Sequence, residues 1–404
     1  MHKNKQVIGL FGFGVVGEGL YKVLDIAPSA NACIKKIVVK NPDKVRNAPE
    51  DIISLNPHDI LNDPEINLVV ELISNADDAY AIVKKALSKG KSVVSGNKNM
   101  VAKHLPEFIE LQKENKAALL YDASACGSIP VIRNLEEYYD NDLLKSVTGI
   151  LNGSSNYILS QIFKENKSYS VALKEAQEMG FAEADPTFDV DGFDALFKLI
   201  IITMHGFGTY VNPNEVFHFG ISKIHANDIK YAREKEKKIK LVAQVCKLNG
   251  DAITLFVLPK LVDKSEYIYN VEQEFNGVVI EGECYDKQFM FGKGAGAFPT
   301  GSSVLSDITA RTNNYKYEYK KKNYFMSPVY TSEAEINIYL RYNNLVDFSY
   351  FDFSKISEKY SGESYNYVTG TIKISKLLEI KEIIPKLDVF IAVTSNQINF
   401  AECE

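Results

Sequence analysis

The sequence has no tryptophan and few cysteines, and the scarcity of cysteine restricts what kind of protein it encodes. The cysteines are odd in number, widely separated and never arranged as a CxxC pair; they are Cys33, Cys126, Cys246, Cys284 and Cys403. Disulfide-stapled domains and structural zinc sites both need paired or closely spaced cysteines. We therefore expect neither, and we expect a chain that works in a reducing compartment.

Long hydrophobic runs and an excess of positive charge are also missing. An apolar run such as Leu199–Met204 is far too short to span a bilayer, and the first residues lead into a strand-like segment rather than a signal sequence. The net charge of −6 gives no electrostatic footprint for nucleic acid, and we interpret the lysine-rich stretches 235–240 and 320–322 as solvated. These absences predict a cytoplasmic protein with neither a membrane nor a nucleic-acid partner.

The length of 404 residues exceeds what one hydrophobic core usually supports, which indicates two or three domains. Residues 6 to about 150 alternate apolar strands with amphipathic helices. The strands are expected at 7–11, 34–40, 68–73 and 92–95, and the helices from residue 16 and at 79–89. Strands that are apolar on both faces, with helices between them, are typical of a parallel sheet covered on both sides.

The rest of the chain mixes helices and strands differently. Helical patterns cover residues 171–179, 194–204 and 228–248, and strand-like runs cover 252–257 and 277–281. We interpret residues 136–310 as an α+β domain. From about residue 330, strands at 336–342, 365–374 and 389–393 alternate with helices at 353–360 and 375–387, which predicts a small βαβαβ module over 330–404.

A glycine-rich turn follows the first apolar strand and opens the first helix. Its sequence is Gly12-Phe13-Gly14-Val15-Val16-Gly17. In a dinucleotide-binding turn the first glycine permits the tight bend, the second lets the backbone approach a pyrophosphate, and the third allows close packing of helix on strand. The helix N-terminus offers amides and a positive dipole end to the phosphates. The turn predicts a Rossmann-type α/β domain over residues 1–135, with these six residues at the cofactor.

The end of the second strand bears on the choice between NAD and NADP. NAD-specific sites usually place an acidic residue there, which accepts hydrogen bonds from the ribose hydroxyls. This sequence has Lys40 instead, with Lys44 and Arg46 close behind it. A cation suits a 2′-phosphate and so favours NADP. The three residues equally fit an exposed loop, and NAD stays open.

A carboxylate-rich segment, residues 183–194, leads into an apolar helix that carries Lys198. Asp194 and Lys198 are four residues apart and therefore share one face of that helix. Because residues 196–202 are otherwise nearly all apolar, we expect the pair to be partly buried, and buried charges need a partner or a purpose. An ammonium beside a carboxylate can give and take a proton at a substrate oxygen. Spacing alone allows this role and also a pair that only fixes the helix.

Seven strings of the sequence, taken in order, resemble the homoserine dehydrogenase family. They are Gly12–Gly17, Val69–Leu72, Gly90–Val94 with Asn97-Lys98, Gly149–Leu159, Ala184–Pro186, Asp191–Lys198 and Gly294–Thr300. The resemblance covers residues 6 to about 310. It implies NAD(P)-dependent interconversion of aspartate 4-semialdehyde and homoserine. It also implies that residues 136–310 form a substrate-binding and dimerisation domain, that residues 295–325 complete the Rossmann domain, and that the chain is a homodimer.

The same resemblance implies roles for single residues. Lys198 matches the catalytic proton donor and acceptor, Asp194 the acid beside the substrate hydroxyl, and Lys98 a second active-site lysine near the nicotinamide. The other implied substrate-binding residues are Glu183, which receives the substrate ammonium, Asp189, Gly153 and Ser154. The other implied cofactor-binding residues are Ser74, Gly294 and Gly296. Glycines at the last two positions equally suit a tight backbone crossing.

A loop at residues 122–130 resembles the family's monovalent-cation loop. The implied sodium ligands are the carboxylate of Asp122 and the carbonyls of Ala125, Gly127 and Ile129, and such hard oxygen donors suit that ion. Asp122 stands where glutamate is usual.

The C-terminal module lies where many members of the family carry a regulatory ACT domain. Its turn at residues 343–348 lacks the Asp-x-Pro-Gly sequence that builds an amino-acid effector site. We therefore expect a degenerate ACT-like α+β module without threonine inhibition.

Two other functions are considered. A semialdehyde dehydrogenase of the same architecture needs a thiol nucleophile, for which Cys126 is the only remotely placed candidate. A cofactor-binding sensor that has lost its chemistry would not need Lys98, Glu183, Asp194 and Lys198. Turnover of the cofactor separates an enzyme from such a sensor.

Overall fold

The computed structural model describes residues 5–249, 251–363 and 365–399, which divide into two compact units. The first unit holds the described residues up to Asp140 together with Gly292–Asn323. The second unit holds Asn141–Phe291 and the described residues from Tyr324 onward. The chain therefore leaves the first unit after Asp140, returns to it at Gly292 and leaves it again after Asn323.

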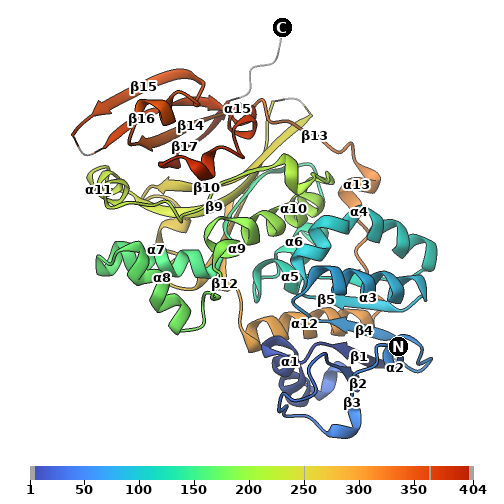
Figure 1. Cartoon of the computed structure of the whole chain (residues 1–404). Helices are drawn as coiled ribbons and strands as arrows, with labels where there is room; N and C mark the ends of the chain where they lie inside the picture. Colours follow the sequence, from blue (N-terminus) through green and yellow to red (C-terminus); the bar gives the residue numbers. More distant parts are fainter. Residues whose placement is uncertain (1–4, 250, 364, 400–404) are drawn as a thin grey trace. The chain divides into compact units, whose positions relative to one another are not determined.

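The first unit is built on a sheet whose strands all run parallel, in the order β3-β2-β1-β4-β5-β6 (Figure 1). The strands are β1 (Gln6–Phe11), β2 (Ala32–Val38), β3 (Ile53–Ser54), β4 (Leu68–Glu71), β5 (Ser92–Ser95) and β6 (Leu119–Leu120). Every residue of β4 and β5 is buried, because the strands of a parallel sheet are covered on both faces. The predicted Rossmann-type sheet is confirmed.

The unit also contains helices. They are α1 (Val15–Ile26), α2 (His58–Leu61), α3 (Ala76–Ser88), α4 (Lys98–Asn115), α5 (Ala123–Cys126), α6 (Val131–Glu137), α12 (Ala297–Thr312) and, at the end of the unit, α13 (Lys320–Tyr324). Of these, α1, α2, α3 and α12 contact strands of this sheet. Helix α12 comes from the returning segment and packs against α1 (Figure 1). Glycine permits this contact, since a Cβ on Gly19 would lie 2.1 Å from the Ala297 carbonyl oxygen.

The second unit contains one long mixed sheet in the order β12-β11-β7-β9-β10-β17-β14-β16-β15. Its strands are β7 (Leu144–Ile150), β9 (Lys238–Lys247), β10 (Ala252–Val262), β11 (Phe275–Gly282), β12 (Asp286–Lys293), β14 (Glu335–Tyr342), β15 (Phe353–Ser361), β16 (Asn366–Lys373) and β17 (Val389–Asn399), with β8 (Phe217–His218) and β13 (Val329–Tyr330) pairing onto β10. Its helices are α7 (Gly153–Glu165), α8 (Tyr169–Glu178), α9 (Thr187–Val190), α10 (Phe193–Phe207), α11 (Ala226–Glu234), α14 (Leu345–Phe348) and α15 (Ile374–Glu379). Strand β9 is buried along nearly its whole length.

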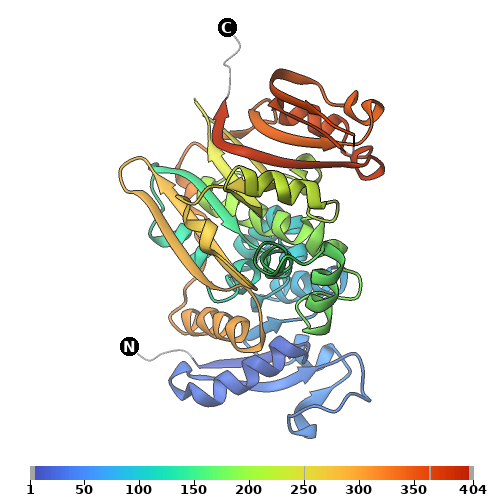
Figure 2. The same cartoon turned by 90° about the vertical axis from the view of Figure 1, so that its left-hand side faces the viewer.

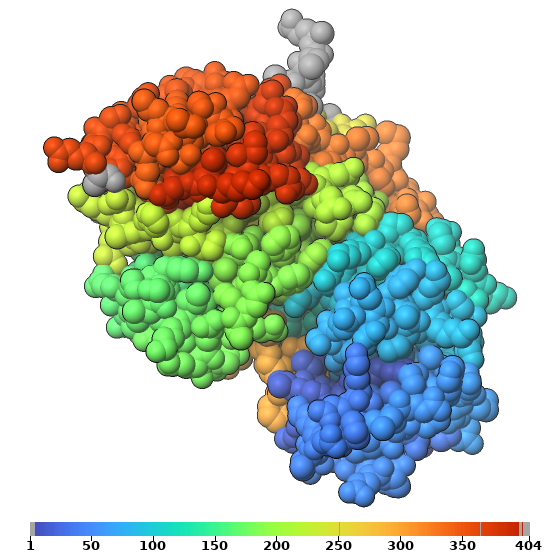
Figure 3. Space-filling view, viewed as in Figure 1, coloured from blue at the N-terminus to red at the C-terminus, as the bar shows by residue number. Residues whose placement is uncertain are grey.

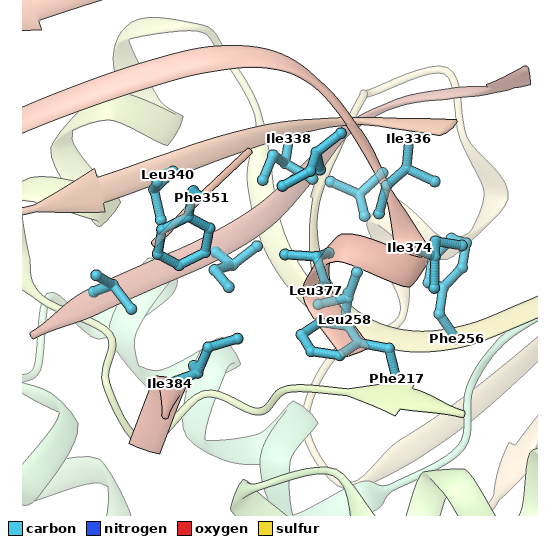
Figure 4. Close-up of a cluster of buried hydrophobic side chains, with 14 of the residues drawn as sticks. Phe217, Phe256, Leu258, Ile336, Ile338, Leu340, Phe351, Ile374, Leu377 and Ile384 are labelled. Carbon is cyan, nitrogen blue, oxygen red and sulfur yellow. The ribbon is translucent and has the colours of Figure 1, made fainter. Parts of the chain in front are cut away.

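The C-terminal module, defined as β14 to β17, continues the sheet of the second unit. Figure 2 shows β17 (red) running the length of the module, and β17 pairs with β10 where Lys260 meets Val393. The module shares one hydrophobic core with β8 and β10, in which Phe217, Phe256 and Leu258 pack with Ile336 and Ile338 (Figure 4). On the surface the module lies directly on α11 (Figure 3). The module is therefore an extension of the second unit and does not have a core of its own.

The structure corrects two predicted helices. The helix predicted at 228–248 ends at Glu234, and β9 begins at Lys238 after Glu236, whose φ of 55° breaks the helix. The helix predicted at 353–360 is the edge strand β15, whose hydrophobic spacing imitates a helix but whose backbone pairs with β16. The module is thus β-α-β-β-α-β rather than βαβαβ, and its second helix, α15, ends at Glu379 rather than continuing to 387.

The two lysine-rich stretches, 235–240 and 320–322, were predicted to be solvated, and this prediction is wrong for two of their lysines. Lys240 is only 1% exposed, because it lies in β9 and its ammonium donates to the Val271 carbonyl at 2.6 Å. Lys321 is also buried.

Cysteine pairing and membrane spans bear on the predicted compartment. The cysteines that the structure describes, Cys33, Cys126, Cys246 and Cys284, form no disulfide; Cys403 lies outside the described residues. Across residues 5–249, 251–363 and 365–399, no helix combines the length and the apolar character needed to cross a membrane.

Candidate active site

The glycine-rich turn joins β1 to α1, and its glycines are needed for different reasons. Gly12 has a φ of +91°, and a Cβ there would lie 2.7 Å from the Leu72 carbonyl oxygen. A Cβ on Gly17 would lie 2.4 Å from the Gly12 carbonyl oxygen. A Cβ on Gly14 would meet no heavy atom within 4 Å, which leaves the space at the start of α1 open. Gly12 and Gly17 allow the fold, whereas Gly14 keeps the helix N-terminus accessible.

The order of the strands places this turn where open α/β sheets bind ligands. Chain order reverses between β1 and β4, so the loops after these two strands flank a topological switch point. Phe13 is buried and Val15 is 69% exposed, and Val15 and Val16 form the first turn of α1. Gly14, the residue before that turn, provides no side-chain cap. The backbone amides of the first turn of α1 are therefore available to an anion.

Lys40 lies two residues past the end of β2 and is exposed. Its ammonium is 3.5 Å from a carboxylate oxygen of Asp78, at the start of α3. The guanidinium of Arg46 donates to the Lys44 and Asn41 carbonyls. Arg46 therefore holds together the loop that follows β2. Of the three cations predicted near the ribose, Lys40 is the one that is paired only loosely and at the surface.

Ser74 and Lys98 follow neighbouring parallel strands. Ser74 is exposed in the loop between β4 and α3. Lys98 is the first residue of α4, whose amide at Met100 is capped by the Asn97 side chain at 3.0 Å. Because β4 and β5 are parallel neighbours, both residues lie at the same edge of the sheet as the glycine-rich turn.

Gly294 and Gly296 lie in the segment that returns to the first unit. A Cβ on Gly127 would lie 2.5 Å from the Gly294 carbonyl oxygen, so the backbone crosses closely here. Gly296 has a φ of +128° and precedes α12. The crossing accounts for glycine at position 127, and the φ accounts for glycine at 296.

In the second unit, the pair Asp194 and Lys198 is buried as predicted. Lys198 is 7% and Asp194 is 3% exposed, and the ammonium lies 2.7 Å from Asp194 Oδ2. The same ammonium donates to the Leu151 carbonyl at 2.7 Å. Two acceptors thus fix the Lys198 nitrogen.

Asn152 is a residue that the sequence interpretation missed. Its Nδ2 donates to Asp189 Oδ1 at 2.8 Å and to Asp194 Oδ2 at 2.9 Å. Its Oδ1 caps α7 by accepting from the Ser155 amide at 2.8 Å. Asp189, Asp194 and Lys198 are therefore joined in one network. The position of Asn152 directly before Gly153 and Ser154, in a string that matches the family, was the available signal.

The other predicted substrate residues lie around this network. Glu183 is exposed in the loop between α8 and α9. Ser154 donates to the Phe181 carbonyl and so ties that loop to the start of α7. A Cβ on Gly153 would lie 2.6 Å from the Glu274 carbonyl oxygen, which explains glycine there by packing alone.

The predicted cation loop is closely hydrogen-bonded. Asp122 Oδ1 accepts from the Ile132 and Arg133 amides at 3.1 Å each, and the Ile129 carbonyl accepts from the Val131 amide at 2.8 Å. Arg133 pairs with the buried Asp307 at 2.6 Å. Burial and the neighbouring Asp122 raise the pKa of Asp307, while Arg133 lowers it. Among the described residues, no cluster of three His, Cys, Asp or Glu side chains suits a metal.

Cys126, the thiol that an aldehyde dehydrogenase would need, is fully buried at the end of α5. A nucleophilic cysteine must reach its substrate as a thiolate. Its burial argues against that alternative.

Comparison with known proteins gives one consistent family. The family model described as "Homoserine dehydrogenase, NAD binding domain" matches residues 12–122, and the model "Homoserine dehydrogenase" matches residues 130–309. The homoserine dehydrogenase of Bacillus subtilis is 35% identical over 332 residues, which are 80% of this chain and 76% of that protein.

Solved structures of homoserine dehydrogenases are similar to this chain. A homoserine dehydrogenase from Thiobacillus denitrificans matches with a TM-score of 0.83 at 30% identity, over 97% of this chain and 98% of that one. A hyperthermophilic archaeal homoserine dehydrogenase mutant in complex with NADPH matches with a TM-score of 0.66 at 26% identity, over 78% of this chain and 100% of that one. The chain therefore belongs to the homoserine dehydrogenase family and is an NAD(P)-dependent oxidoreductase.

Proposed function

We propose that this protein interconverts L-aspartate 4-semialdehyde and L-homoserine, on the branch of the aspartate pathway that leads to threonine, methionine and isoleucine. The observation that carries the proposal is the buried Lys198, whose ammonium is held by Asp194 and the Leu151 carbonyl. An alcohol–aldehyde interconversion needs a group that exchanges one proton with the substrate oxygen. Lys198 is a buried cation on α10. The network beside it, made of Asp194, Asn152 and Asp189, can orient a substrate.

In the reducing direction, a bound nicotinamide would supply the hydride for the aldehyde carbon. Lys198 Nζ gives its proton to the aldehyde oxygen, and the reverse reaction returns it. Asp194 orients the ammonium, and the Leu151 carbonyl holds it in place. Glu183 receives the substrate ammonium. The residues that line the substrate pocket are Asp189, Gly153 and Ser154. Lys98 is the second active-site lysine, at the end of the substrate that reacts.

The cofactor is bound through the glycine-rich turn, with Ser74, Gly294 and Gly296 as further contacts and NADP preferred over NAD. Exposed Lys40 at the end of β2 supports this preference, because a cation there attracts a 2′-phosphate. The complex of the archaeal relative with NADPH supports it as well. The ratio of NADPH to NADH oxidation tests the preference.

The loop at Asp122 is proposed to hold a monovalent cation. Its donors are oxygens, which suit sodium, and the residues that would hold the ion are Asp122, Ala125, Gly127 and Ile129. Bound there, the ion would brace the loop without taking part in proton transfer. A melting temperature that rises in sodium chloride and not in choline chloride tests it.

The chain is proposed to act in the cytoplasm as a homodimer that associates through the sheet of the second unit. The edge strand β12 carries Phe289 and Phe291, which are 36% and 52% exposed, and Phe289 stacks on the half-exposed Tyr267 at 5.7 Å. Exposed aromatic clusters at a sheet edge favour association. Sedimentation of the wild type and of Phe291→Glu tests this, with a shift to monomer expected in the variant.

The decisive experiment measures NADPH and NADH oxidation with aspartate 4-semialdehyde. Lys198→Ala is expected to lower turnover by roughly a hundredfold to ten-thousandfold, while nucleotide binding stays intact. Lys174→Ala is the matched control, because Lys174 also pairs with an acid four residues away but is exposed. Wild-type protein that binds nucleotide without turnover would point instead to a cofactor-binding sensor.

A further inference from the structure

The last residue of β4, Glu71, is an acid in an otherwise apolar buried strand. It is fully buried, as are Leu68, Val69 and Val70 before it. Its Oε1 accepts from the Ile73 amide at 2.7 Å, and its Oε2 accepts from the Ser95 hydroxyl at 2.5 Å. Glu71 therefore joins the end of its own strand to the end of β5.

The contacts continue into the loops that follow both strands. The Ser95 hydroxyl accepts from the Asn97 amide at 3.0 Å, and Asn97 Nδ2 donates to the Ile73 carbonyl at 3.1 Å. Glu71, Ser95, Asn97 and Ile73 thus form a closed ring of hydrogen bonds. Ser74 directly follows one member of this ring and Lys98 directly follows another.

The position of the ring in the sheet assigns it to one half of the cofactor. In this topology the ribose that is read at the end of β2 belongs to the adenosine half, and the pyrophosphate lies at the turn after β1. By the strand order β2-β1-β4-β5 (Figure 1), the nicotinamide half of a bound cofactor would then lie over the ends of β4 and β5. The Glu71 ring, which is at the ends of these two strands, would lie beneath that half.

Burying an acid at this place lowers the stability of the fold. Burial raises the pKa of Glu71 to about 7, although its two hydrogen bonds lower it. A leucine or valine would suit the strand better, and a buried polar group is tolerated only when its partners satisfy it. The ring satisfies Glu71 and at the same time fixes the spacing of two loops.

We infer that Glu71 is a positioning residue for the nicotinamide half of the cofactor, acting through Ser95 to hold the loops that carry Ser74 and Lys98 at one spacing. This inference rests on the proposed function, since it takes Ser74 and Lys98 to face the nicotinamide. It predicts that damage to the ring affects one half of the cofactor and leaves the other half unaffected.

The test compares binding of NADPH with binding of 2′,5′-ADP, which contains only the adenosine half; NADH and ADP replace them if the enzyme prefers NAD. Glu71→Gln preserves the shape but reverses the hydrogen-bond polarity toward Ser95, and Ser95→Ala removes the link to β5. Each variant should weaken NADPH binding by about tenfold and lower kcat, and leave 2′,5′-ADP binding within about twofold.

Ser92→Ala is the matched control. It removes a buried hydroxyl from the other end of the same strand, where Ser92 accepts from the Ala118 amide. It should leave binding of both ligands unchanged. Equal weakening of both ligands in Glu71→Gln and Ser95→Ala, or no weakening in either, would overturn the inference alone. Wild-type protein that binds neither ligand would overturn the proposed function with it.

Discussion

At the scale of single residues, Asn152 illustrates how one amide side chain can serve both fold and site. Its oxygen caps α7, while its two Nδ2 hydrogens reach Asp189 and Asp194. Hydrogen bonds from one amide group to the Asp189 and Asp194 carboxylates offset part of the repulsion between these two acids. The side chain therefore keeps both acids in place next to Lys198.

Replacing Asn152 by serine separates these two functions. Serine also caps helices, so the melting temperature of Asn152→Ser should stay close to that of the wild type. The donors to Asp189 and Asp194 are lost, so kcat/KM should fall by at least about tenfold. Asn344→Ser, which alters a similar cap at α14 away from the site, serves as control. An unchanged kcat/KM in Asn152→Ser would show that the amide is only a cap.

Glu71 also makes stability depend on pH. Burial raises its pKa from 4.5 to about 7 in the folded chain, so the unfolded chain loses the proton first as pH rises. The stabilising contribution is present below about pH 4.5 and is lost as pH rises through about 7, by roughly 1.4 kcal/mol per unit of pKa shift. Urea unfolding at about pH 5 and pH 7.5 should show the wild type losing stability relative to Glu71→Gln. Parallel pH profiles of the two proteins would contradict this.

At the scale of elements, the turn between β1 and α1 offers a matched pair of substitutions. Gly12→Ala must take a φ of +91° against the Leu72 carbonyl, and it should destabilise the fold by about 1–3 kcal/mol. Gly14→Ala finds open space and should fold like the wild type. If a pyrophosphate approaches Gly14, its alanine variant should nevertheless bind nucleotide more weakly. Melting temperatures and nucleotide titrations measure both effects; tight binding by Gly14→Ala would place the phosphates elsewhere.

Elements differ in how far local sequence predicts them. The strands β1, β4 and β5 were predictable because each is a short apolar run flanked by turn-forming residues and followed by an amphipathic helix. The segment 228–248 was not, because its apolar residues fit a helix and a doubly buried strand equally well. Only pairing of β9 with β7 and β10 selects the strand. The edge strand β15 was misread for the same reason, since its partner β16 is not visible in its own pattern.

At the scale of the whole molecule, the C-terminal module belongs to the second unit. Arg341 on β14 is fully buried and donates to Asp228 on α11 at 3.1 Å, and Tyr339 donates to the same carboxylate at 3.0 Å. Hydrogen bonds close the turn before α14. Asn344 Oδ1 accepts from the Asp347 amide, and the Asp347 carboxylate accepts from the amide of Asp388, just before β17, at 3.2 Å. An effector that bound at this turn would have to displace these bonds.

Threonine is therefore expected to leave the enzyme active. Initial rates of NADPH oxidation, measured while threonine is titrated through the sub-millimolar range, should stay at the value without threonine. Strong inhibition in that range would show that the module binds an effector in spite of its closed turn. The module would then be a regulatory ACT domain rather than a degenerate one.

The sequence by itself determined the glycine-rich turn, the Rossmann-type sheet and the family, because each depends on short local strings of residues. It also placed Asp194 and Lys198 on one helical face, since that relation depends only on helical spacing. The tertiary structure decided what holds them: the Leu151 carbonyl lies 47 residues from Lys198, and Asn152 lies 42 residues from Asp194. It likewise joined Glu71 to Ser95 across 24 residues. Such contacts arise when the chain folds back on itself, and no local pattern of residues encodes them.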